Sequence, residues 1–160
     1  MMLFTSHSVS KWSPMPQSHI PSAASRATIA QLAEPRSVRS LNPIAARFVY
    51  SLRLIALHQR VKCDPVPELA ARLNSFDVAA KSLALSQAVS EVWPEDVHLS
   101  RFCCCKLTHD EATMATALEA VADRDRAAFD RALVGLLRPD RVQRLWDDAA
   151  DLVMAELRAL

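Results

Sequence analysis

Three consecutive cysteines followed by a histidine are the arrangement in this sequence that best supports a chemical hypothesis. The run extends from Cys103 to Cys105, and His109 follows at a predicted helix start. Thiolates two positions apart and an imidazole four residues further on can reach one tetrahedral zinc ion. A fourth ligand would come from Cys63, His98 or water. Our candidate metal ligands are Cys103, Cys105, His109 and Cys63.

Two other interpretations of these cysteines compete with a zinc site. Adjacent cysteines seldom share one ion, and the sequence has no second Cys-x-x-Cys pair, so the spacing matches no standard zinc motif. Buried cysteines also act as small hydrophobic side chains in a packed connector, and this is the interpretation we favour. Thiol redox chemistry is the third alternative, because a helix N-terminus favours a thiolate.

No motif for catalysis appears elsewhere in the sequence. Gly-x-Ser-x-Gly, His-Glu-x-x-His and an EF-hand loop are all missing. Asp147, Asp148 and Asp151 lie close together in a predicted helix, but a solvated acidic face paired with Arg144 explains them better than a cation site. We therefore expect no enzymatic activity.

The amino-acid composition indicates an all-α fold, so the residues named above should be positioned by helices and their connectors. The 160 residues include one glycine, Gly135, and 26 alanines. Alanine is the best helix former, whereas dinucleotide-binding folds, P-loops and tight hairpins depend on glycine. We predict an irregular bundle of five or six helices.

Charge and composition divide the chain into a basic arm and a helical domain. Residues 1–41 are rich in serine and proline, which predicts a disordered arm, and residues 42–160 form one predicted domain. Residues 1–62 carry eight Lys or Arg against one acid, whereas residues 63–160 carry eleven against seventeen. The basic residues are scattered and form no run with interleaved aromatic side chains, so we expect a solvated arm and no nucleic-acid partner.

Local signals place the helix starts. Thr108-His109-Asp110-Glu111 fits a capping box, in which the threonine hydroxyl and the glutamate each satisfy a backbone N–H at the helix start. The segment 95–107, which contains the cysteines, has no helical period. The other predicted starts are Asn42-Pro43, Asp64-Pro65, Ser75, Asp123 or Asp125, and Pro139.

The first predicted helix, from residue 43 to about residue 62, is apolar on two sides. Such a helix lies at the centre of a bundle or at a partner interface. Arg53 and Arg60 are expected among the polar residues that separate the two apolar stripes. The stripes consist of Ile44, Phe48, Leu52 and Ile55, and of Tyr50, Leu54, Leu57 and Val61.

From Phe48 to about Asp123 the layout resembles a family of small uncharacterised alphaproteobacterial proteins. The resemblance lies in an apolar helix with an internal arginine, Ser51-Leu-Arg-Leu-Ile-Ala-Leu-His58, and in the segment Cys103-Cys-Cys-Lys-Leu-Thr-His-Asp-Glu111. It implies that the cysteine segment is a family feature, and it implies no activity.

The favoured function is a protein-interaction or regulatory module that binds an unidentified protein partner or a second copy of itself. The alternative is a zinc or thiol-redox protein that uses Cys103, Cys105 and His109.

No apolar stretch reaches the about 20 residues that a membrane span needs, so no membrane contact is expected. The first residues lack the apolar region of a secretion signal, which favours a cytoplasmic location.

Overall fold

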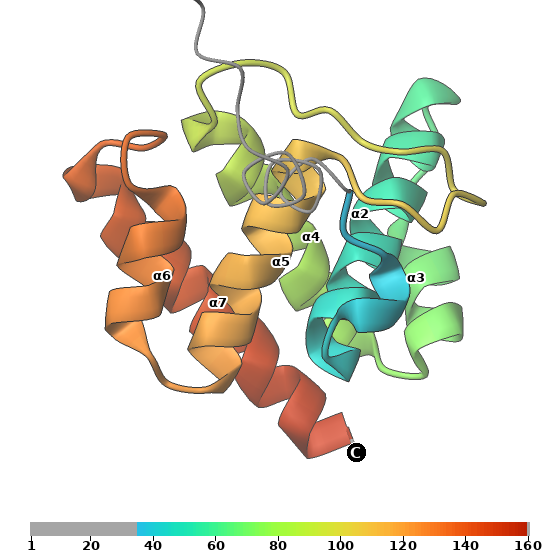
Figure 1. Cartoon of the computed structure of the whole chain (residues 1–160). Helices are drawn as coiled ribbons and strands as arrows, with labels where there is room; N and C mark the ends of the chain where they lie inside the picture. The colour runs from blue at the N-terminus through green and yellow to red at the C-terminus, as the bar shows by residue number, and fades with distance from the viewer. Residues whose placement is uncertain (1–34, 160) are drawn as a thin grey trace, which may run out of the picture. The chain divides into compact units, whose positions relative to one another are not determined.

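The computed structural model describes residues 35–159 and shows an all-α fold, as the composition predicted (Figure 1). The predicted disorder of residues 1–34 lies outside the described residues. The described part contains one short 3-10 helix and six α-helices, which confirms the predicted bundle. They are η1 (Val38–Ser40), α2 (Pro43–Arg60), α3 (Val66–Leu73), α4 (Phe76–Val92), α5 (His109–Ala122), α6 (Arg126–Leu133) and α7 (Pro139–Ala159).

Side-chain caps start most of these helices at the predicted positions. The Asn42 side chain accepts from the backbone N–H of Ala45 at 2.8 Å, and Pro43 occupies the first turn of α2. Ser75 caps α4, and Asp125 caps α6 in the same way. These side chains satisfy N–H groups that have no partner within the helix, and they therefore fix where each helix begins.

The helices pack in pairs around one main core. α4 lies against α7 and α3, α5 against α6, and α2 against α5 and α4. Trp93 is buried in this core, and Trp146 contacts Phe129 edge-on with 5.1 Å between the ring centroids, so both tryptophans serve as core anchors. No helix in the described part is long and apolar enough to span a membrane.

Residues 35–41 belong to the folded domain, so the predicted boundary of the arm at residue 41 is too late. Ser37 forms an isolated antiparallel bridge with Lys106, and Val38 and Leu41 pack on a small second core. The sequence prediction followed the serine and proline content of the arm and gave no role to Val38 and Leu41. In the structure these two apolar side chains pack on the second core. The second core consists of Ala45, Val49, Leu107 and Ala115.

The connector between α4 and α5 carries the cysteines. It covers residues 93–108, contains no helix, and passes beside α2 across the upper end of the bundle in Figure 1. Its position next to α2 and residues 35–41 brings three distant parts of the sequence to one side of the molecule.

Candidate functional site

Arg53 of α2 is buried, although the sequence pattern placed it among the polar residues of that helix. Its side chain is 5% exposed and pairs with Glu111, whose side chain is fully buried. The distances are 2.7 Å from Nε to Oε1 and 2.9 Å from Nη2 to Oε2. Arginine presents its donors in a rigid planar fork, which suits such a bidentate pair.

The carboxylate of Glu111 is also part of the capping box at the start of α5. The Thr108 hydroxyl accepts from the Glu111 N–H at 3.1 Å, and the Glu111 carboxylate accepts from the Thr108 N–H at 2.9 Å. The backbone N–H of Ser100 donates to the same carboxylate at 3.1 Å. The predicted capping box is therefore confirmed, and it extends into a wider network.

This network lowers the pKa of Glu111. Burial alone would raise that pKa, because it penalises the charged form. The hydrogen bonds from Arg53, Thr108 and Ser100 and the charge of Arg53 act in the opposite direction and prevail. The carboxylate is therefore held in its ionised form.

The remaining donors of Arg53 hold the backbone of the cysteine segment. Its guanidinium donates to the carbonyl oxygens of Cys104, Lys106 and Arg101. From the other side, the Val38 N–H donates to the carbonyl of Cys105 at 2.9 Å. Arg53 is thus the centre about which the connector folds.

The structure exposes the predicted thiol ligands. All four cysteines are free; Cys63, Cys103 and Cys105 are exposed, and Cys104 is half-buried. The interpretation of the connector cysteines as buried packing residues is therefore wrong for Cys103 and Cys105. The reason is that the connector turns its backbone, rather than its thiols, toward Arg53.

The four candidate zinc ligands are not assembled into one site. Cys63 follows the last turn of α2, where its thiol contacts the Val61 carbonyl oxygen at 3.7 Å, and His109 is exposed at the start of α5. His98 lies 3.6 Å from Asp110 and is largely exposed. Within residues 35–159 no group of three or more His, Cys, Asp or Glu side chains could hold a metal ion. Zinc binding stays the alternative hypothesis of the sequence analysis.

The acidic residues of α7 lie apart from these groups and have partners of their own. Asp147 accepts from Gln143, Asp148 lies 3.9 Å from Arg144, and Lys81 donates to Asp151 at 2.6 Å.

Two surface hollows are each bordered by Arg53 and Phe102. The first has a volume of about 260 Å³ and is lined by Val38, Arg39, Tyr50 and the three cysteines, among others. The second, of about 80 Å³, is lined by Leu57, Arg60 and Arg101, among others. We call this surface the arginine-lined face, and define it by Arg39, Tyr50, Leu57, Arg60, Arg101 and Phe102.

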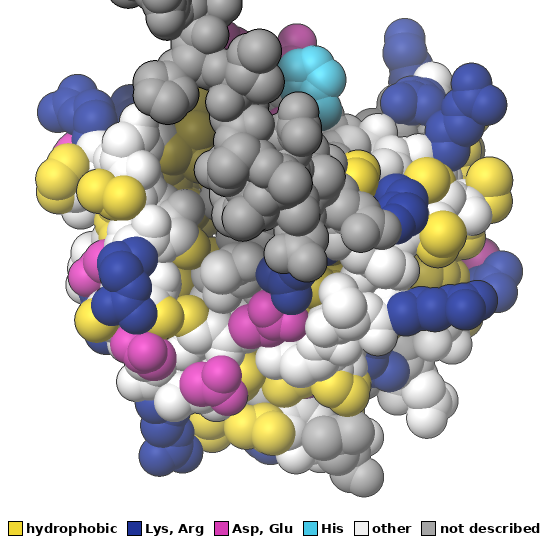
Figure 2. Space-filling view, viewed as in Figure 1, with side chains coloured by type: hydrophobic (Ala, Val, Ile, Leu, Met, Phe, Trp, Pro, Cys, Tyr) yellow, Lys and Arg dark blue, Asp and Glu magenta, His cyan; other side chains and the backbone are white. Residues whose placement is uncertain are grey.

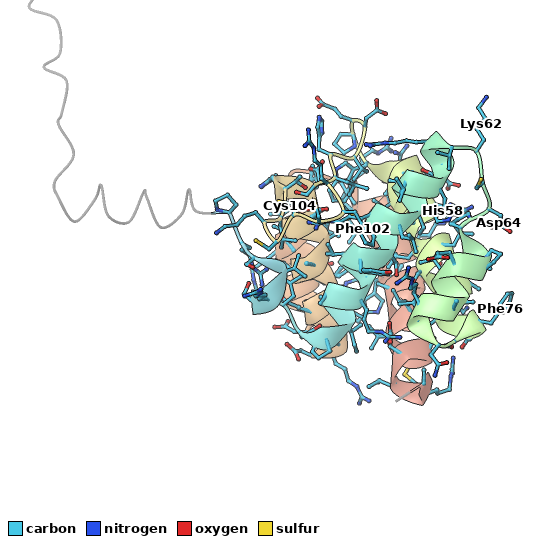
Figure 3. The ribbon with its side chains drawn as sticks, turned by 90° about the vertical axis from the view of Figure 1, so that its right-hand side faces the viewer. His58, Lys62, Asp64, Phe76, Phe102 and Cys104 are labelled. Atoms are coloured by element: carbon cyan, nitrogen blue, oxygen red, sulfur yellow. The ribbon has the colours of Figure 1, made fainter. Side chains whose placement is uncertain are left out.

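Large apolar side chains are exposed on the arginine-lined face. Phe102 is 45% exposed and contacts Tyr50 edge-on, with 5.0 Å between centroids. Leu57 is 47% exposed, and Val61 beyond it is 62% exposed. The second predicted apolar stripe of α2 is thus buried at Leu54 and open toward its C-terminal end. Figure 3 shows Phe102 and Cys104 on the side of α2 that faces the viewer.

The arginines of this face have no acidic partner in the described part of the chain. Arg39, Arg60 and Arg101 form no ion pair with another described residue, whereas most other described arginines do. No acidic side chain lines either hollow. Figure 2 shows Lys and Arg side chains interspersed with hydrophobic ones on the right-hand side, where α2 and α3 lie in Figure 1.

Comparison with known proteins adds no family to this description. No protein-family model, curated protein or solved structure matches the chain. A function therefore has to be argued from the arrangement of the side chains.

Sequence reasoning missed three of the residues that matter most here. Arg53 looked like a surface residue, Phe102 drew no interpretation, and Glu111 was predicted only as a helix cap. A signal for Arg53 was present, because it lies directly between the apolar residues Leu52 and Leu54 on a helix that is apolar on two sides. Its partner, 58 residues away, leaves no local trace.

Proposed function

We propose that this protein is a protein-interaction module that binds an acidic, partly apolar segment of a protein partner on the arginine-lined face. The observation that carries the proposal is the combination of the exposed apolar side chains of Leu57 and Phe102, beside the half-buried Tyr50, with arginines that lack an acidic neighbour. Aromatic residues and arginine are the types enriched at protein interfaces.

Charge complementarity determines the chemistry of the partner. Most exposed arginines elsewhere in the described chain have a carboxylate beside them, whereas the three arginines of this face have none and are available to a carboxylate from outside. Complementary charge speeds association and excludes partners of the same sign. An acidic segment with an apolar side can form ion pairs with the arginines and also cover the exposed apolar side chains.

The backbone below this face is held in place before a partner arrives. Arg53 binds the carbonyl oxygens of Cys104 and Lys106, and Phe102 rests on Tyr50. A surface that is already ordered loses less entropy on binding than a mobile one. The fixed connector therefore supports the proposed role.

The test uses two labelled synthetic peptides that form amphipathic helices with the same apolar side. One carries Glu and Asp on its polar side and the other carries Lys. Fluorescence anisotropy should detect binding of the acidic peptide alone, and added salt should weaken it because salt screens exposed charges. Equal binding of both peptides would contradict the proposal.

A charge-reversed variant locates the binding surface. Arg60→Glu combined with Arg101→Glu should raise the dissociation constant of the acidic peptide by at least about tenfold, or 1.4 kcal/mol in binding free energy. The matched control is Arg124→Glu combined with Arg141→Glu, which changes the net charge equally, because both arginines are exposed, form no ion pair with a described residue and line neither hollow. A loss in the control as large as that in the variant of Arg60 and Arg101 would show that only net charge matters. Sedimentation of the unliganded protein tests whether a second copy is the partner instead.

A further inference from the structure

The three consecutive thiols line a hollow that small molecules can enter. Cys103 and Cys105 are exposed, Cys104 is half-buried, and all three border the first hollow of about 260 Å³ together with Tyr50 and Phe102. All are free. Accessible thiols of this kind react, whereas buried structural thiols are inert.

The backbone that carries these thiols is held from both sides. Arg53 donates to the carbonyls of Cys104 and Lys106, the Val38 N–H donates to the Cys105 carbonyl, and the Cys104 N–H donates to the Arg101 carbonyl at 2.9 Å. These bonds use the backbone groups of the segment and leave its side chains outside. The thiols therefore remain presented to the hollow.

Positive charge lies close to the thiols. Arg39 lines the same hollow and forms no ion pair with a described residue. The pKa of Arg53 is raised first by its hydrogen bond to Glu111, against the effect of burial, and further by the nearby groups of Cys104 and Cys103. Arg53 is occupied by Glu111 and the carbonyls, so Arg39 is the cation that an anionic molecule in this hollow would meet.

We propose that the cysteine segment undergoes reversible thiol–disulfide exchange with anionic low-molecular-weight disulfides, whose carboxylate Arg39 binds. One of the three cysteines loses its proton to solvent, and its sulfur attacks a sulfur of the disulfide. A new S–S bond forms with one half of that molecule, and the other half leaves as a thiolate. The cysteine is oxidised and the leaving half is reduced, so the step needs no further oxidant.

This inference goes beyond the proposed function, because the reaction takes place without a protein partner. The chain also provides an internal reference in Cys63, which is free and exposed but lines neither hollow of the arginine-lined face. Cys63 lies between Lys62 and Asp64, whose charges offset each other. Figure 3 shows Lys62 and Asp64 at the end of α2 away from Cys104.

The experiment treats the reduced full-length protein with excess glutathione disulfide and follows each cysteine by peptide mass spectrometry. The mixed disulfide should form in the segment at least about tenfold faster than at Cys63, and a dithiol reductant should remove it. With the uncharged 2-hydroxyethyl disulfide the ratio of the rate in the segment to the rate at Cys63 should fall to about two or less, because this disulfide has no carboxylate for Arg39 to bind. Cys103→Ser, Cys104→Ser and Cys105→Ser then identify the reacting residue.

Arg39→Gln should abolish the preference for the anionic disulfide and leave the reaction with the uncharged one unchanged. Arg39 is exposed, so the variant keeps the fold, which circular dichroism checks. Reaction no faster in the segment than at Cys63 would overturn the proposal. An equal advantage with the uncharged disulfide would overturn the role of Arg39 and the specificity for anions. Neither outcome bears on peptide binding, so the two proposals fail separately.

Discussion

The guanidinium of Arg53 and the carboxylate of Glu111 form a buried bidentate ion pair that joins α2 to the first turn of α5. The two residues are 58 positions apart, and their shortest contact is 2.7 Å. The carboxylate accepts two backbone N–H groups besides Arg53, and the guanidinium donates to three backbone carbonyls besides Glu111. One pair of side chains thus satisfies five backbone groups of the connector.

Removing one partner of this pair should destabilise the protein strongly. Arg53→Met leaves Glu111 as an unpaired buried charge and removes the donor of three carbonyls. Loss of one partner of a buried pair costs about 3–5 kcal/mol in the free energy of unfolding. Chemical denaturation measures the difference.

Two controls separate the buried charge from the mere loss of an arginine. Arg53→Met combined with Glu111→Leu removes the unpaired buried charge but leaves five backbone groups of the connector without their side-chain partners, so it should recover only part of the lost stability. Arg72→Met, which breaks an exposed pair with Glu68, should leave the midpoint nearly unchanged. If Arg53→Met lowers the free energy of unfolding no more than Arg72→Met does, the Arg53–Glu111 pair does not stabilise the fold.

Acidification should weaken the fold through Glu111. Its pKa is lowered in the folded protein from an ordinary value of 4.5, so its contribution is fully present above that pH. The contribution is lost as the pH falls through the lowered folded-state pKa. Unfolding free energies measured between neutral pH and about pH 3 should therefore fall more steeply for the unmodified protein than for Glu111→Gln. Parallel curves would contradict the assignment.

The helix cap at Thr108 should contribute measurably to stability. Its hydroxyl accepts from the Glu111 N–H and donates to the His98 carbonyl at 2.7 Å. Thr108→Ala should lower the free energy of unfolding by about 1–2 kcal/mol. Thr113→Ala in the same helix serves as the control and should have little effect. A midpoint that Thr108→Ala does not change would show that the cap is dispensable.

Protein purified without added metal should contain less than one zinc per chain. The expectation rests on the dispersal of Cys63, Cys103, Cys105 and His109 in the described part. Elemental analysis after dialysis measures the content. A one-to-one ion that survives dialysis would reverse the expectation, and Cys103→Ser, Cys105→Ser and His109→Ala should then each lower metal content and stability together.

The helix starts could be predicted because their causes are local. Asn42, Ser75, Thr108 and Asp125 each bond a backbone group three residues away, so type and spacing alone reveal them. The capping box at Thr108 is the clearest case, and both of its hydrogen bonds are present.

The site could not be predicted to the same degree, because its contacts join distant residues. Arg53 is buried because Glu111 and the connector pack against it. The hydrophobic periodicity of α2 counts every arginine as a polar residue and therefore cannot predict this burial. Residues 35–41 likewise depend on Leu107 and Ala115, which lie far along the chain. The exposure of the cysteines follows from the direction in which the connector turns, which no spacing rule encodes.

The Arg53–Glu111 pair also has a consequence for hydrogen exchange. The amides of Ser100 and Thr108 donate to the Glu111 carboxylate, and the amide of Val38 donates to the Cys105 carbonyl in the segment that Arg53 holds. None of these bonds belongs to a regular helix, so each amide by itself would be expected to exchange quickly. Because the bonds share one support, these amides should instead become protected as a single set and open to solvent together, in a cooperative unit that includes both ends of the cysteine connector.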